Sequence, residues 1–353
     1  MTAFRRLTHA ASTLVRAHVG PTAIVLTYHR VAALRSDPQL LAVSPEHFAA
    51  HLQVLAERYR VLPLQELVAA LGCGRVQDKT VAVTFDDGYA DNLENAMPLL
   101  EQAGVPATVF VGSGQLGGPE YWWDELERVV LLGGQPPEFL QIVLPSGTFS
   151  ESATTSGHAE TAESDLDSAW DVLRPPGTRS QRLYVELCDF LRSLGHSERE
   201  MALEQIRSAF GTPLRVRPTH RTLSPEEVRM LDASAVIDVG AHSFHHDELA
   251  MRSMAEQTRA IVDDKAFLEE VCGHSVHMFS YPYGESGSFS DETVSIVKQA
   301  GFLGACANYP APVKSRTDPF RIPRYVVRDW TGAEFGEHLA RWFGGTGPWH
   351  GAR

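Results

Sequence analysis

The sequence of 353 residues predicts an α/β fold, a β/α barrel that is interrupted by one large insertion. Three apolar runs have the length and the β-branched composition of buried strands. Each run ends in side chains that can do chemistry: His29 follows 23–28, Asp86 and Asp87 follow 81–85, and His242 follows 236–241. Because a β/α barrel gathers its active site where its strands end, this pattern predicts both the fold and the face that carries the site.

The remaining elements follow in the order of strand, then helix. Ser44 offers an N-cap, Pro45 stands at the first helical position, and apolar residues then repeat at helical spacing, which predicts a helix over 45–58. The same periodicities predict helices over 90–103, 255–271 and 288–300, and strands over 107–111 and 302–307.

Residues 116–221 interrupt this alternation and are too long for a loop in a compact domain, so we expect an inserted, mainly helical subdomain. A hairpin is expected over 139–149 and two helices over 180–210. The first part, 120–171, holds eleven acidic residues and one arginine, whereas 174–221 holds nine arginines, so the two parts are expected to pack together. A lid over the barrel mouth is the alternative, with Trp122 or Trp123 stacking on a sugar instead of anchoring a core.

The adjacent carboxylates of Asp86 and Asp87 are the strongest sign of chemistry in the chain. Two ionised groups side by side repel each other, and a bound cation or a proton shared with a substrate would remove the conflict. Gly88 allows a sharp turn just past them. A solvated Asp-Gly turn would carry the same residues, so this stretch alone leaves both interpretations open.

Histidines supply further candidate ligands. His242 and His246 are four residues apart, so one helical turn would place them on one face, although His245 fits that spacing as well. Two neutral imidazoles and one carboxylate form a zinc site with an open position, the pattern of catalytic centres.

Three segments together resemble the motifs of the polysaccharide deacetylases of carbohydrate esterase family 4, the NodB homology domain. The segments are Thr84-Phe-Asp-Asp-Gly88, His242-Ser-Phe-His-His246 and Tyr281-Pro-Tyr-Gly284. The resemblance covers about 20–115 and 222–330 and implies a distorted (β/α) barrel.

The resemblance also implies roles. Asp87, His242 and His246 would hold a divalent metal, most often Zn²⁺, with Co²⁺, Ni²⁺ and Mn²⁺ as alternatives, and the second motif selects His246 over His245. Asp86 would be the general base that deprotonates a water molecule. The third motif, with Tyr281, Pro282 and Tyr283, would line the substrate pocket, where the backbone N–H near Tyr283 would help to stabilise the oxyanion.

Two departures from the family pattern concern the partners of the base and the source of the acid. Many relatives begin the third motif with an arginine that pairs with the base, but Ser280 stands here. Arg324 could replace that arginine or could be a surface residue at a strand end.

The late Leu-His-Asp motif is also missing from 285–353. Tyr28-His29 resembles a branch that includes biofilm poly-N-acetylglucosamine deacetylases, in which this histidine is the acid. The alternative is that His29 is a buried residue that satisfies a backbone carbonyl.

The expected organisation has four parts: an N-terminal helix (1–19), the barrel (20–115 and 222–333), the inserted subdomain or lid (116–221), and a C-terminal helix and tail (334–353). The net charge of −13 argues against a nucleic-acid partner, and no apolar run is long enough for a membrane span. Residues 1–19 make a poor signal peptide, so a cytoplasmic protein is expected, with peripheral membrane contact as the alternative.

The expected function is that of a metal-dependent hydrolase that removes an N-acetyl or related acyl group from an amino-sugar substrate. The substrate could be a nucleotide sugar, a lipid-linked glycan, an oligosaccharide or a glycosylated metabolite. Two alternatives remain: a hydrolase of linear or cyclic non-sugar amides, and an inactive glycan-binding relative. Retention of the base Asp86 beside the metal ligands argues against the second alternative. The sequence leaves the oligomeric state open.

Overall fold

The computed structural model describes residues 22–152 and 169–344. The helix expected over 1–19 and the end of the tail, 345–353, lie outside the described residues. None of the helices in the described part of the chain combines the length and the apolar character that crossing a membrane requires.

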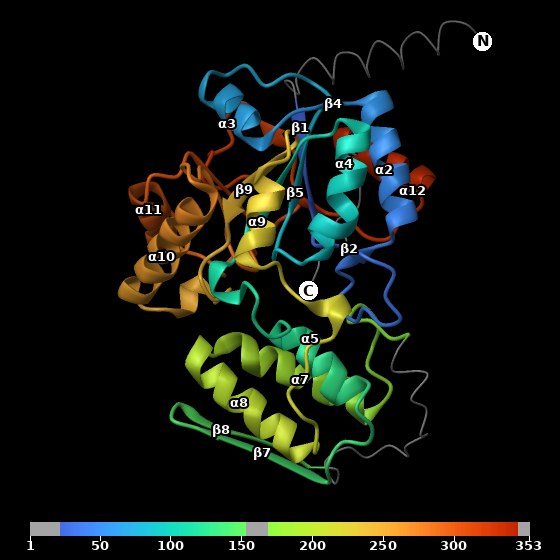
Figure 1. Cartoon of the computed structure of the whole chain (residues 1–353), viewed down its shortest axis with the longest axis vertical. Coiled ribbons are helices and arrows are strands. Elements are labelled where there is room, and N and C mark those ends of the chain that lie inside the picture. The colour runs from blue at the N-terminus through green and yellow to red at the C-terminus, as the bar shows by residue number, and fades with distance from the viewer. Residues whose placement is uncertain (1–21, 153–168, 345–353) are drawn as a thin grey trace, which may run out of the picture.

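One curled sheet forms the centre of the molecule (Figure 1). Its order is β11 (Gly304–Cys306), β10 (Met278–Ser280), β9 (Ile237–Ala241), β6 (Ala107–Val111), β5 (Thr80–Phe85), β1 (Thr22–Tyr28) and β12 (Val313–Lys314). All neighbours in this order are parallel except β12, which is antiparallel to β1, and the short β4 (Arg60–Val61) also pairs with β5. Most side chains of the parallel strands are apolar and buried, since both faces of the sheet are covered, and the carboxyl ends of the strands meet at one edge.

A short segment near the C-terminus joins the two sides of the curled sheet. β13 (Tyr325–Val326) pairs with β1, with Leu26 opposite Tyr325. Ile322, just before it, bridges to Cys306 of β11. Residues 322–327 therefore contact both β1 and β11, and the distorted barrel that the sequence predicts is confirmed.

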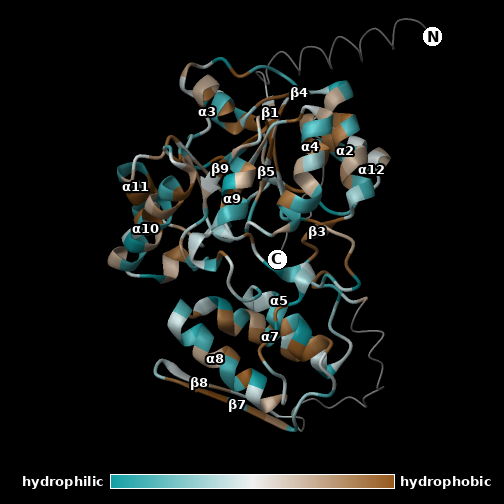
Figure 2. Ribbon diagram, in the orientation of Figure 1, coloured by the Kyte–Doolittle hydropathy of each residue, from teal (hydrophilic) through white to brown (hydrophobic). Residues whose placement is uncertain are grey.

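Helices cover the outside of the barrel, with their apolar sides turned toward the sheet (Figure 2). They are α2 (Pro45–Arg58), α3 (Leu64–Gly72), η1 with α4 (Asn92–Ala96 and Met97–Ala103), α9 (Pro225–Asp232), α10 (Met254–Cys272), α11 (Asp291–Gln299) and α12 (Gly332–Gly344). The predicted helices 45–58, 90–103, 255–271 and 288–300 correspond to α2, η1 with α4, α10 and α11. The Ser44 side chain caps α2 by accepting a hydrogen bond from the backbone N–H of His47, as its position predicts.

The inserted residues pack around an apolar core of their own, below the barrel in Figure 1. Their elements are α5 (Trp122–Leu126), the π-helical η3 (Glu127–Leu131), the hairpin of β7 (Phe139–Leu144) and β8 (Gly147–Ser152), α7 (Arg179–Ser193) and α8 (His196–Ala209). The expected hairpin and the two expected helices are present. The acidic and basic parts of the insertion do pair: Glu120 and Glu127 bind Arg217, and Glu125 binds Arg207.

Candidate metal and catalytic site

Asp86 and Asp87 leave the end of β5 in different directions because the chain turns sharply between them. The Asp86 backbone N–H still donates to the carbonyl of Tyr28, so Asp86 continues the pairing with β1. Asp87 adopts φ +74°, in the left-handed region, and Gly88 follows at φ +59°. A non-glycine residue held in this region is strained, and such strain is concentrated at functional sites. The turn gives the two buried carboxylates different neighbours.

Asp87 faces the two predicted histidines. Its Oδ1 lies 3.4 Å from His242 Nε2 and 3.3 Å from His246 Nε2, and all three side chains are buried. The predicted helical turn is wrong, because residues 242–246 form a loop in which Ser243 and His246 have positive φ of 63° and 53°. The loop, and not i,i+4 helix geometry, aims both imidazoles at one carboxylate.

These three side chains fit a divalent cation. Asp87 Oδ1 is buried and has no hydrogen-bond partner among the described residues. His242 Nδ1 lies 2.8 Å from the carbonyl oxygen of Ser280, and since a carbonyl only accepts, Nδ1 carries the hydrogen and Nε2 is the nitrogen that can bind a cation. Burial lowers the pKa of the His246 imidazole, which keeps that ring neutral as a ligand must be.

His245 is separated from this group. Its ring stacks on His196 of α8, with ring centroids 3.7 Å apart, so it contacts the inserted subdomain. The selection of His246 over His245 agrees with this geometry.

Asp86 is held by Arg324, which reaches it from the segment that joins β1 and β11. The guanidinium donates at 2.8 Å to Oδ1 and at 2.6 Å to Oδ2 of the carboxylate. It also donates to Thr84 Oγ1 at 3.1 Å and to Ser280 Oγ at 2.9 Å. The surface interpretation of Arg324 is wrong, because the side chain is completely buried.

This pairing decides the charge of Asp86. Burial acts to raise the pKa of the Asp86 carboxyl, but Arg324 and the nearby His242 outweigh it, so the pKa lies below its ordinary value. Ser280 is small, and the Arg324 guanidinium, which comes from the segment before β13, lies against its hydroxyl. Asp86 is therefore an ionised carboxylate at neutral pH.

His29 lies one residue beyond β1 and is half-buried. Its ring makes no hydrogen bond to any described residue, and its carbonyl accepts from the Asn92 side chain. Burial lowers the pKa of the imidazole, while the Asp87 and Asp86 carboxylates act to raise it. The ring therefore satisfies no backbone carbonyl and lies within electrostatic reach of both aspartates.

The residues of the third motif lie in two places, some in the barrel wall and one beside the candidate ligands. The Tyr281 hydroxyl donates to the carbonyl of Phe320 and its ring stacks on Phe289, so this side chain belongs to the barrel wall. Pro282 is buried beside it. Tyr283 has φ +61°, and its ring lies edge-on to His246 with centroids 4.8 Å apart. Of the three residues expected to line the pocket, Tyr283 is the one in contact with a predicted ligand.

Trp122 and Trp123 are core residues, only 8 % and 6 % exposed. Trp123 packs edge-on against His246 at 5.1 Å between centroids, and its Nε1 donates to the Tyr89 hydroxyl. An exposed sugar-stacking platform on either ring is contradicted by this burial. Trp123 instead supports a predicted metal ligand from behind.

Sequence reasoning missed several buried supports of the ligand loop. Asp264 of α10 accepts the backbone N–H of His242 at 2.9 Å and that of Ser113 at 2.7 Å. Burial raises the pKa of its carboxyl to about 6. From the insertion, Arg199 of α8 binds Asp247 at 2.7 Å, next to His246. In the sequence, the only sign of these contacts among the described helices is that a charged residue, Asp264, stands on the apolar face of α10.

Comparisons with known proteins point to one family. The sequence model of the family described as "Polysaccharide deacetylase" matches residues 74–135 and 197–305. YxkH of Bacillus subtilis (strain 168), whose name assigns it provisionally to the polysaccharide deacetylases, is 32 % identical over 103 residues, which are 29 % of this chain and 36 % of that protein. The match thus spans about a third of the length of that relative.

Two solved structures share the fold. Streptococcus pyogenes deacetylase PplD, solved with acetate, has a TM-score of 0.56 at 15 % identity, over 91 % of this chain and 98 % of its own. IcaB from Ammonifex degensii has a TM-score of 0.53 at 18 % identity, over 92 % of this chain and 98 % of its own. At these identities the likeness concerns the fold alone.

Proposed function

The chain carries a domain of the polysaccharide deacetylase family, and from that premise we propose that it is a metal-dependent hydrolase that removes an acetyl or related acyl group from the amine of an amino sugar. The observation that carries the proposal is that the two adjacent carboxylates have different neighbours. Asp87 lies against two histidines, which is the arrangement of a metal ligand. Asp86 pairs with a guanidinium that keeps its carboxylate ionised, which is what a general base requires.

Asp87, His242 and His246 would hold the cation, with Zn²⁺ first and Co²⁺, Ni²⁺ or Mn²⁺ as alternatives. A divalent cation there would act as a Lewis acid on the acyl carbonyl and on a water molecule. Asp86 takes a proton from the attacking water, and Arg324 keeps its carboxylate ionised and correctly oriented. The backbone N–H near Tyr283 helps to stabilise the oxyanion.

His29 donates a proton to the leaving nitrogen. Water oxygen bonds to the carbonyl carbon, the C–N bond breaks, and the products are a carboxylate such as acetate and the free amine. An amine leaves slowly unless it is protonated, and imidazole suits that task near neutral pH.

Two measurements test the proposal together: acetate release from N-acetylated nucleotide sugars, oligosaccharides and lipid-linked glycans, with non-sugar amides alongside, and metal content. Asp86→Asn should keep its metal and lose about 10²- to 10⁴-fold in turnover. Asp87→Asn and His242→Ala/His246→Ala should each lose about one equivalent of metal, the content of a single three-ligand site. Full turnover by Asp86→Asn, or unchanged metal content in the histidine variant, would contradict the assignment.

A further inference from the structure

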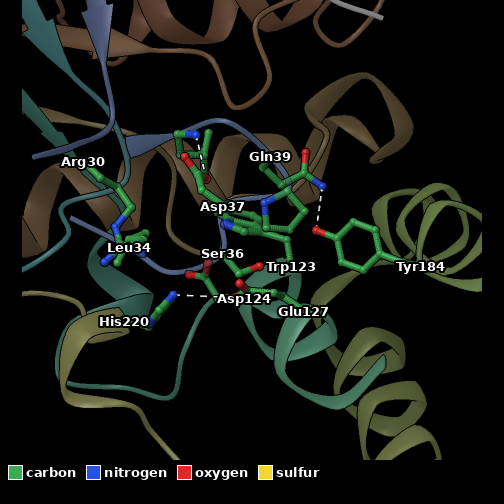
Figure 3. A pocket seen from close by; sticks show the side chains of 12 residues that line it. Arg30, Leu34, Ser36, Asp37, Gln39, Trp123, Asp124, Glu127, Tyr184 and His220 are labelled. Carbon is green, nitrogen blue, oxygen red and sulfur yellow. Dashed lines mark hydrogen bonds and ion pairs between the residues drawn. The ribbon is translucent and has the colours of Figure 1, made fainter. Parts of the chain in front are cut away.

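A second buried group of potential ligands lies where the inserted subdomain meets the barrel. Asp124 of α5, Glu127 of η3 and His220 of the turn η5 (Pro218–His220) place one ligand atom each within 4.8 Å of one another. All three are buried, and they line one pocket together with Ser36 and Arg30 (Figure 3). None of these side chains has a role in the proposed hydrolysis.

Polar atoms in this pocket are left without partners. Glu127 is 2 % exposed, and its Oε1 has no hydrogen-bond partner among the described residues. The same holds for the hydroxyl of Ser36, which is 6 % exposed and comes from a different part of the chain. His220 Nε2 lies 3.6 Å from Glu127 Oε2, too far for a hydrogen bond. Buried polar atoms without partners are costly, so the pocket points to an occupant.

The charges of the pocket favour a cation. Arg30 pairs with Asp91 at 3.0 Å and donates to the carbonyl of Thr219. Arg217 forms ion pairs with Glu120 at 3.0 Å and with Glu127 at 2.8 Å. No guanidinium of the described residues forms an ion pair with the Asp124 carboxylate, which accepts a hydrogen bond from the Tyr89 hydroxyl at 2.7 Å. Because this carboxylate is buried, it needs either a proton or a cation.

The donor set decides between kinds of cation. His220 Nδ1 lies 2.9 Å from the Thr219 hydroxyl, which leaves Nε2 on the side of Glu127. A neutral imidazole with two carboxylates suits Zn²⁺ or Mn²⁺ better than Mg²⁺ or Ca²⁺, which prefer oxygen ligands. The pocket has a volume of about 10 Å³, which fits an ion or a single water molecule and excludes an organic ligand.

We propose that Asp124, Glu127 and His220 form a second divalent transition-metal site, which ties the first helices of the insertion to its last turn, beside the barrel. The cation links α5 and η3 to the η5 turn and replaces the missing partners of Glu127. Trp123 lines this pocket and also contacts His246, so the second site supports the first ligand group through one shared ring.

The experiment counts bound metal in the full chain with the other candidate sites removed. The background variant combines His242→Ala and His246→Ala with Cys272→Ser and His274→Ala, because Asp232, Cys272 and His274 form another group within ligand distance among the described residues. After loading with Zn²⁺ or Mn²⁺ and desalting, this variant should retain about one equivalent by elemental analysis and should melt at a higher temperature than without metal. Adding His220→Gln or Asp124→Asn should abolish both effects.

Absence of metal in a folded background variant, or metal retained after His220→Gln, would overturn the proposal. If the background variant does not fold, Cys272→Ser/His274→Ala alone should bind about two equivalents, and His220→Gln should reduce this to about one. If the Cys272→Ser/His274→Ala variant binds one equivalent and His220→Gln leaves this content unchanged, the proposal is also overturned. Because His220 stands outside the first ligand group, this outcome is separate from any failure of the proposed hydrolase activity.

Discussion

Replacing Arg324 by methionine should destabilise the protein and disable the base in one step. The guanidinium makes two charge-assisted hydrogen bonds to Asp86, at 2.8 and 2.6 Å, and neither side chain is accessible to solvent beyond 5 %. Removing one partner of a buried pair leaves an uncompensated charge, which typically costs about 3–5 kcal/mol. The loss should appear as a lower denaturation midpoint of the folded protein.

The same change should reduce catalysis through the charge of Asp86. Burial still acts to raise the pKa of this carboxyl once Arg324 no longer opposes it, so the carboxylate takes up a proton more readily. Since Arg324 lowers the pKa, the pair stabilises the protein above the ordinary carboxyl pKa and loses this contribution as the pH falls below it. We expect kcat/KM to fall by about 10²-fold or more at neutral pH, and the acid limb of the pH profile to move to higher pH.

Three comparison variants test this reasoning. Arg321→Met removes a half-buried arginine, paired with the exposed Asp291, and should cost about 1 kcal/mol or less. Asp86→Asn/Arg324→Met removes both charges. Its loss in free energy of unfolding should be smaller than the sum of the losses of the two single variants, because no unpaired buried charge remains. Ser280→Arg, added to Arg324→Ala, should restore part of the activity by supplying a guanidinium from the end of β10. An Arg324→Met protein as stable and active as the Arg321→Met control would refute the role of this pair.

Two further predictions concern His29 and Asp264. His29→Ala should cripple amide hydrolysis and spare an activated ester, whose leaving group needs no proton, with metal content unchanged; equal losses on both substrates would indicate a structural role instead. Asp264→Asn should weaken metal affinity by about 10- to 100-fold, because its second oxygen no longer accepts the backbone N–H of His242 or Ser113. Asp263→Asn, the exposed neighbour on the same helix, is the matched control and should bind metal normally, and equal affinities of the two variants would rule out the positioning role of Asp264.

The sequence alone was sufficient for the barrel and for the central side chains of the candidate site. Strand composition and strand endings are local properties, so the apolar runs before His29, Asp86 and His242 could be recognised without knowing the fold. Parallel strands bring their carboxyl ends to one edge, and this rule was enough to predict that these residues meet. The structure places Asp87, His242 and His246 together as that rule requires.

The tertiary structure decided which partners those side chains have. Arg324 meets Asp86 across 238 residues of chain because residues 322–327 join β1 to β11, and nothing in the local pattern around Arg324 distinguishes a closing strand from a surface turn. Likewise, only the packed insertion shows that Trp123 is buried behind His246 and that Asp124 faces His220. The physical reason is that burial and pairing depend on contacts between segments distant in sequence, whereas periodicity reports on neighbours along the chain.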